Sequence, residues 1–197
     1  MIGVLIVQFC YMVEGEQVRV HWAHRFVSEV GGVVINCSWI SDPKTLLIHV
    51  LDVSKEICPR ELIEEYMRYL DMEDRMIVLR KGLELFVKAS EKLARSIVVV
   101  LDEFHTLIDK LSYRIARETR KKKNIVEGDI LWLLREFLES KRVLWILVTS
   151  IGWAKLKEIY FSEAKKEKPL LGVVIKMRLE PLKREESMEL ATKLSQF

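Results

Sequence analysis

The stretch Ser96-Ile97-Val98-Val99-Val100-Leu101-Asp102-Glu103-Phe104-His105 is the clearest structural signal in the chain. Five consecutive apolar residues, Ile97 to Leu101, are followed at once by two carboxylates, and polar and apolar positions do not alternate. A strand that is buried on both faces, in the middle of a parallel sheet, has this pattern. Ligands of open parallel sheets bind outside the carboxyl ends of the strands. The pattern therefore predicts a site at Asp102 and Glu103.

The two carboxylates are expected to take different roles. Side chains alternate in direction along an extended chain, so Asp102 and Glu103 should point differently. One of them could hold a magnesium ion while the other polarises a water molecule. The alternative is that both acids are solvated and only cap the next helix, and a motif this short leaves both interpretations open.

Composition limits the classes of protein that the chain can belong to. It has 197 residues, of which 50% are hydrophobic and 31% charged, which predicts one sizeable folded domain. A net charge of +3 argues against a strong global attraction to nucleic acid or to an anionic membrane. The three cysteines, Cys10, Cys37 and Cys58, lack metal-ligand spacing and fit a reduced, cytoplasmic setting. The apolar run from Ile2 to Val13 is too short to span a bilayer, and no membrane association is expected.

Predicted strands and helices alternate along the chain. The apolar runs predict strands at 2–9, 33–37, 97–101, 143–148 and 173–179. Helical spacing of apolar residues predicts helices at 18–30, 61–70, 75–93, 104–117, 130–138, 153–161 and 183–194, whereas 45–53 fits either. Gly31-Gly32 should close the first helix, Asp42-Pro43 should interrupt regular structure, and Asp74 and Asp129 should cap helices. The alternation predicts an α/β fold, a three-layer sandwich with a mainly parallel central sheet.

In this order the segments resemble the archaeal ATPase family of P-loop NTPases, relatives of the AAA+ and signal-transduction (STAND) ATPases of the ASCE type. Val98 to Phe104 resembles the family's Walker B strand. Residues 130–136 and 144–150 resemble the helix and the sensor strand that come next in that family. Residues 169–172 and 179–186 resemble its closing strand and the first helix of its lid. Together these cover roughly residue 26 to the C-terminus, and their order is more specific than any one of them.

The resemblance implies that ATP and Mg²⁺ are the cofactors. It places Asp102 on the metal side and gives Glu103 the task of orienting the attacking water. Thr149 or Ser150 would sense the terminal phosphate, because the family's sheet places the strand after Walker B next to the phosphate-binding strand.

The phosphate-binding loop departs from the family pattern. Family members carry G-x-x-x-x-G-K-S/T after the first strand, and no such string occurs in this chain. Residues 13–22 occupy that place, where Gly15 is the only glycine and Arg19 or His21 the only candidate cation. A Glu on each side of Gly15 would repel a triphosphate. Weak or absent ATP binding is therefore expected.

The chain is interpreted as a P-loop NTPase-like core at 1–181, with an atypical phosphate-loop region at 1–22, and the start of a truncated helical lid at 182–197. It is either a degenerate ATPase that kept the scaffold, or its first twenty or so residues are not the ancestral reading frame. The expected function is an ATPase-type domain of an archaeal AAA-like switch protein with little or no hydrolysis. The alternative is a non-catalytic module, a remnant of a longer ATPase, that binds a second copy or another protein.

Four further features allow a functional or a structural interpretation. The basic run Arg114 to Lys123 could contact nucleic acid, but a solvated face is favoured because no aromatic residue is interleaved. His105 could be a catalytic base, although a helix start facing solvent or a loop is favoured. His21 and His24 lack a third metal ligand of suitable spacing, and Cys37 is expected to be a packed thiol.

Overall fold

The computed structural model describes residues 4–9, 27–140, 142–149 and 174–179. Its strands form one five-stranded sheet in the order β2-β3-β4-β1-β5, in which every neighbouring pair is parallel. The strands are β1 (Val4–Phe9), β2 (Gly32–Asn36), β3 (Ile97–Asp102), β4 (Val143–Thr149) and β5 (Val174–Leu179). The predicted α/β fold with a parallel sheet is confirmed.

Strand β3 lies inside the sheet between β2 and β4, and all six of its residues are buried. Its side chains alternate between two apolar clusters, as the period of two in a strand requires. Val99 and Leu101 belong to the large core that the helices share, whereas Val98 and Val100 pack with Ile146 and Val148 on the opposite face. Val27, from a helical turn at 27–30, completes this second cluster.

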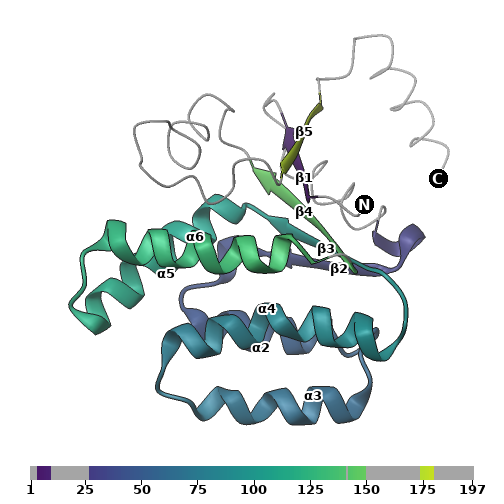
Figure 1. Cartoon of the computed structure of the whole chain (residues 1–197), viewed down its shortest axis with the longest axis horizontal. Helices are drawn as coiled ribbons and strands as arrows, with labels where there is room; N and C mark the ends of the chain where they lie inside the picture. The colour runs from purple at the N-terminus through teal and green to yellow at the C-terminus, as the bar shows by residue number, and fades with distance from the viewer. Residues whose placement is uncertain (1–3, 10–26, 141, 150–173, 180–197) are drawn as a thin grey trace, which may run out of the picture.

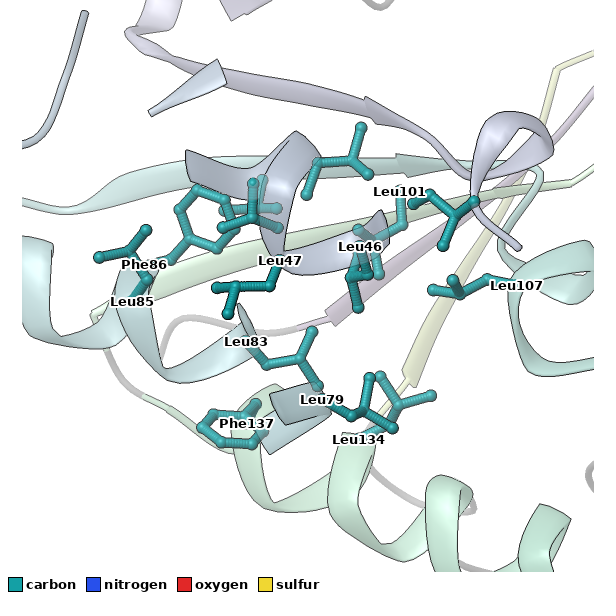
Figure 2. Packing of buried hydrophobic residues seen from close by; sticks show 14 of the residues in the cluster. Leu46, Leu47, Leu79, Leu83, Leu85, Phe86, Leu101, Leu107, Leu134 and Phe137 are labelled. Carbon is teal, nitrogen blue, oxygen red and sulfur yellow. The ribbon is translucent and has the colours of Figure 1, made fainter. Parts of the chain in front are cut away.

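Apart from the turn at 27–30, the described helices gather on one side of the sheet (Figure 1). They are α2 (Pro43–Val53), α3 (Arg60–Met67), α4 (Arg75–Lys92), α5 (Phe104–Thr119) and α6 (Lys123–Leu138), with short 3-10 turns η1 (Cys37–Trp39) and η2 (Arg68–Asp71). Figure 2 shows leucine and phenylalanine side chains from α2, α4, α5 and α6 meeting β3 in one core. Phe86 of α4 packs edge-on against Trp145 of β4, with ring centroids 6.0 Å apart.

Asp42 and Pro43 start a helix, which corrects the prediction that they interrupt regular structure. The Asp42 carboxylate accepts hydrogen bonds from the amides of Lys44 (2.8 Å) and Thr45 (3.0 Å), and Pro43 occupies the first helical position. Proline suits that position because its missing N–H would have no partner there. The segment that fitted either state is accordingly the helix α2. Asp74 caps α4 in the same way, as predicted.

Two other boundaries differ from prediction. Helix α6 begins at Lys123, so Asp129 lies inside it and does not cap it; buried Val126 extends the apolar face of the helix one turn before Ile130. Cys37 belongs to η1 and not to β2. Gly31 closes the turn at 27–30 with φ +77°, as predicted. Residues 18–26 of the helix predicted at 18–30, and the helices predicted at 153–161 and 183–194, lie outside the described residues. None of the described helices is long and apolar enough to cross a membrane.

Candidate functional site

The acid pair lies where β3 ends and α5 begins. Asp102 is the last residue of β3 and is 2% exposed, and Glu103 is 6% exposed. Glu103 has left-handed backbone angles, φ 56° and ψ 40°, which a non-glycine residue adopts at a cost in free energy. Such strain is found mostly at functional positions, where surrounding contacts hold it in place. Both acids are therefore buried at the carboxyl edge of the sheet, and they are not the solvated pair of the alternative interpretation.

His105 connects Glu103 to the neighbouring strand. Its Nδ1 lies 3.1 Å from Oε2 of Glu103 and 3.0 Å from Oγ1 of Thr149. Thr149 is the last residue of β4 and is fully buried, and the His105 side chain is mostly buried. His105 lies at a helix start, as predicted, but the expectation that it faces solvent or a loop is wrong, because its ring contacts the end of β4. One imidazole nitrogen therefore contacts both Glu103, which was expected to orient water, and Thr149, which was expected to sense phosphate.

The end of β2 adds Asn36, which the sequence did not point to, and Cys37. Asn36 stands opposite Asp102 in the parallel register, and its Oδ1 accepts a hydrogen bond from the amide of Ser38 (3.0 Å). The next residue, Cys37, is completely buried, and its pKa is raised well above the ordinary value by burial and by the negative charges of Asp102 and Glu103. A thiol held in its neutral form is a poor nucleophile, so Cys37 is a packed residue, as predicted.

Sheet topology brings the carboxyl ends of all five strands to this edge. Strand β4 lies between β3 and β1, and in the register Thr149 is paired with Gln8 of β1, which is paired in turn with Arg178 of β5. The chain leaves β1 for β2 on one side and leaves β4 for β5 on the other, so the direction of the connections reverses between β1 and β4. Such reversal points are where open α/β sheets bind ligands. Thr149 lies at that point, and Ser150, Gly15 and Arg19 lie outside the described residues.

The oxygen donors at this edge suit Mg²⁺ better than a metal that needs a complete protein cage. Within the described part of the chain no three or more His, Cys, Asp and Glu side chains gather into a metal-binding group. Magnesium is usually held by one or two carboxylates together with phosphate oxygens and waters. Asp102 can provide such a carboxylate, with Glu103 and Thr149 beside it.

Comparisons with known proteins identify the fold. No family model matches the sequence, and no curated protein matches it. Among solved structures, a Walker-type ATPase of Pyrococcus abyssi matches with a TM-score of 0.67 at 17% identity, over 96% of this chain and 52% of the other. The ORC2 protein of Aeropyrum pernix, solved as ADPNP–ADP complexes, gives a TM-score of 0.55 at 16% identity, over 100% and 46%.

Cdc6p from Pyrobaculum aerophilum gives a TM-score of 0.52 at 12% identity, over 98% of this chain and 43% of the other. The chain thus spans about half the length of the structures that it matches. At these identities the matches concern the fold: the chain has the α/β fold of the Walker-type and Cdc6/ORC ATPases.

Proposed function

We propose that this chain is an ATPase-type nucleotide-binding domain that takes Mg-ATP at the carboxyl edge of its sheet. The observation that carries the proposal is the link from Glu103 through His105 to Thr149, located beside the reversal of the strand connections. It joins two buried polar groups that would otherwise lie apart on neighbouring strands. The likeness in fold to Walker-type and Cdc6/ORC ATPases supports it.

Each residue has a role in this proposal. Asp102 would hold Mg²⁺, which when bound neutralises charge on the phosphate oxygens. Glu103 would accept a hydrogen bond from the attacking water and so orient it. Thr149, with Ser150, would donate hydrogen bonds to the terminal phosphate. Gly15 and Arg19 remain the candidates for the phosphate-loop side.

Hydrolysis is expected to be slow or absent. Positioning and charge stabilisation supply nearly all of the catalysis in phosphoryl transfer. In P-loop NTPases the lysine of the G-x-x-x-x-G-K-S/T loop provides a large part of that stabilisation, and the sequence contains no such loop. The carboxylates Asp102 and Glu103 cannot replace a missing cation.

The test combines a thermal-shift titration with Mg-ATP and an ATPase assay on the full chain. Mg-ATP should raise the melting temperature, because a ligand at about 100 times its Kd adds about 2.7 kcal/mol of stability. Glu103→Gln should keep this shift and remove any residual turnover, whereas Glu64→Gln, an exposed carboxylate on α3, should change neither.

Two results would count against the proposal. Brisk turnover that Glu103→Gln abolishes would show that the inference about the loop is wrong. A protein that shows no shift with Mg-ATP and forms a dimer in sedimentation at several concentrations would instead be the non-catalytic interaction module.

A further inference from the structure

Positive charge is concentrated in one segment of the chain. Residues 110–123 contain seven Lys or Arg and one acid, Glu118, for a net charge of +6. The whole chain has 32 cations and 29 acids, so the remaining residues contribute 25 cations and 28 acids, a net charge of −3. The small overall charge of +3 therefore hides a strongly basic region on an otherwise slightly acidic molecule, and such a region attracts polyanions.

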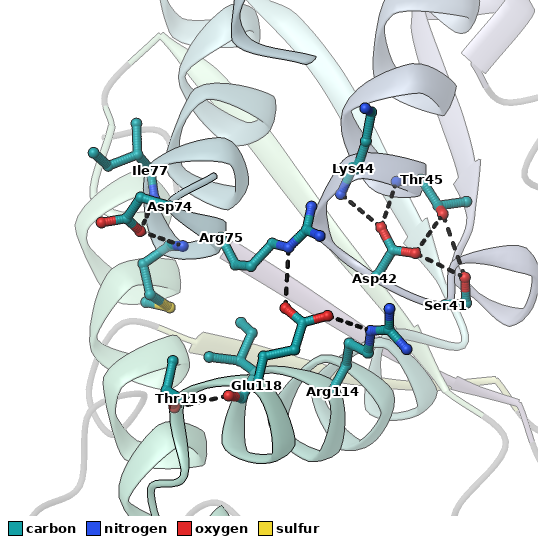
Figure 3. Close-up of polar contacts among 12 residues, drawn as sticks. Ser41, Asp42, Lys44, Thr45, Asp74, Arg75, Ile77, Arg114, Glu118 and Thr119 are labelled. Atoms are coloured by element: carbon teal, nitrogen blue, oxygen red, sulfur yellow. Dashed lines mark hydrogen bonds and ion pairs between the residues drawn. The ribbon is translucent and has the colours of Figure 1, made fainter. Parts of the chain in front are cut away.

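About half of these cations remain available for a partner. Glu118 lies between Arg75 and Arg114 and pairs with both, at 3.0 Å and 2.7 Å (Figure 3). Lys123 pairs with Asp109, and Lys121 with Asp129.

Four cations keep an exposed charge. Arg117, Arg120 and Lys122 form no ion pair with any carboxylate of the described residues, and all three are exposed. Lys110 is also exposed, and it donates a hydrogen bond to the backbone carbonyl of Ser38 (2.6 Å).

Two aromatic side chains accompany these cations. Trp39 is 75% exposed and Tyr113 is 63% exposed, which makes them the two most exposed large hydrophobic side chains among the described residues. The bond from Lys110 to Ser38 fastens α5 to η1, so Trp39, the residue after Ser38, is held beside this part of α5. Tyr113 follows Lys110 by three residues and precedes Arg117 by four, so the three share one face of α5.

The basic run was expected to be a solvated face because no aromatic residue is interleaved in it, but aromatic residues lie close to it in the structure. Tyr113 directly precedes the run Arg114 to Lys123, and the turn that carries Trp39 is bonded to Lys110, three residues before Tyr113. From Lys110 to Arg120 the face extends about 15 Å at 1.5 Å per residue.

We propose that this face binds single-stranded nucleic acid. Its residues are Trp39, Lys110, Tyr113, Arg117, Arg120 and Lys122, and we call it the α5 face. The cations would contact phosphates, and the two aromatic rings would stack on bases. Unpaired bases expose a π-face to a protein ring, whereas the bases of a duplex are already stacked on one another and an acidic peptide has none. The proposal does not depend on nucleotide binding at the carboxyl edge of the sheet.

The first test concerns stacking. Fluorescence anisotropy of a labelled single strand of about 20 nucleotides, a length that exceeds the site of most such domains, reports binding to the full chain. Trp39→Ala and Tyr113→Ala should each weaken binding roughly 5- to 100-fold, as loss of one stacked base does. Trp132→Ala is the matched control: Trp132 is also partly exposed, at 44%, but it lines a hollow between α4 and α6 together with Asp129, Glu136 and Glu139. It should leave the affinity unchanged.

The second test concerns charge. For single strands the logarithm of the affinity falls with the logarithm of salt concentration, with a slope of about −0.7 for each phosphate contacted. Arg117→Gln and Lys122→Gln should each make the slope less steep by about 0.7. Arg60→Gln, which removes an exposed cation paired with Glu64 on α3, should not change it.

Three outcomes would overturn the proposal. The first is an absence of binding at low salt. The second is equal binding of a duplex and a single strand, unaffected by Trp39→Ala and Tyr113→Ala, because charge alone would then explain it. The third is competition by polyglutamate that is as effective as competition by the unlabelled oligonucleotide.

Discussion

His105 is the residue that connects Glu103 to Thr149 in the candidate site. An ionised carboxylate can only accept hydrogen bonds, so in the tautomer of His105 that bonds such a carboxylate at Glu103, Nδ1 carries the hydrogen. Thr149 Oγ1, 3.0 Å from the same nitrogen, is then a second acceptor of that one hydrogen. A change in the partner of Thr149 therefore alters how strongly His105 holds Glu103. In the proposed function, a phosphate that accepts a hydrogen bond from Thr149 would therefore change the hydrogen bond between His105 and Glu103.

A double-mutant cycle tests the link. His105→Ala and Thr149→Val should each lower the free energy of unfolding by about 0.5–3 kcal/mol, because each removes a hydrogen bond from a buried polar side chain. The double variant should lose less than the sum of the two by about 0.5–3 kcal/mol, since both remove the same interaction. Urea denaturation measures all four proteins. Losses that add within about 0.3 kcal/mol would show that the two side chains are not coupled.

The sequence could indicate the residues that a local pattern marks, but not those whose role depends on a residue far away along the chain. Asp102 and Glu103 follow an unbroken apolar run, and Thr149 ends another, so local pattern was enough to mark them. The role of His105 depends on Thr149, 44 residues away, and Asn36 meets Asp102 only because β2 and β3 are neighbours. Contacts of this kind come from strand pairing, which a local pattern does not specify.

At the scale of the elements, the predicted helix boundaries were wrong where the same local sequence is compatible with two structures. An Asp followed by Pro can form a turn or can cap a helix whose first residue is proline, and here it caps α2. The lysine-rich segment before α6 had the composition of a loop, yet the helix begins at Lys123, and Val126 packs in the core. By contrast, β3 has an apolar run that fits only a doubly buried strand, and it was predicted correctly.

Asp42 gives the α2 cap a dependence on pH. Burial alone would raise the pKa of Asp42, but hydrogen bonds from Thr45, Lys44 and Ser41 lower it below its ordinary value. A carboxyl group whose pKa is lowered by folding stabilises the protein fully above its unfolded pKa of about 3.9, and this stabilisation is lost as pH falls through the folded pKa. Asn caps about as well as Asp but does not titrate in this range.

Asp42→Ala should therefore lower the free energy of unfolding at neutral pH by about 0.5–2 kcal/mol. The stability difference between the wild type and Asp42→Asn should shift against the wild type when the pH is lowered from about 6 to about 3. Chemical denaturation at a series of pH values measures both effects. A difference that is constant over this range would mean that the carboxylate does not gain its hydrogen bonds on folding.

At the scale of the whole molecule, the alternation of strands and helices was sufficient to predict a parallel sheet covered by helices. It was not sufficient to order the strands. Strand β4 lies between β3 and β1 although β1 and β4 are more than 130 residues apart in the sequence, and only the resemblance to P-loop ATPases suggested this neighbourhood. The position of the candidate site depends on that order, because it places Thr149 at the reversal of the connections.

The contact between Phe86 and Trp145 joins the helical layer to the middle of this sheet. Both rings are buried, and Phe86 lies in the core that α2, α4 and α6 share (Figure 2). Phe86→Ala should lower the free energy of unfolding by about 3–5 kcal/mol, through lost transfer energy and the cavity left behind. The free energy of unfolding of a domain is about 5–15 kcal/mol in total, so this one substitution should remove a large part of it.

Phe86→Leu should cost less, about 1.5 kcal/mol, because it keeps most of the buried volume, although it gives up the edge-on contact with Trp145. Urea denaturation followed by tryptophan fluorescence measures both variants, and an unchanged m-value would show that the same surface is exposed on unfolding. If Phe86→Ala cost no more than Phe86→Leu, the helices and the sheet could not share the single close-packed core that holds the acid pair at its edge.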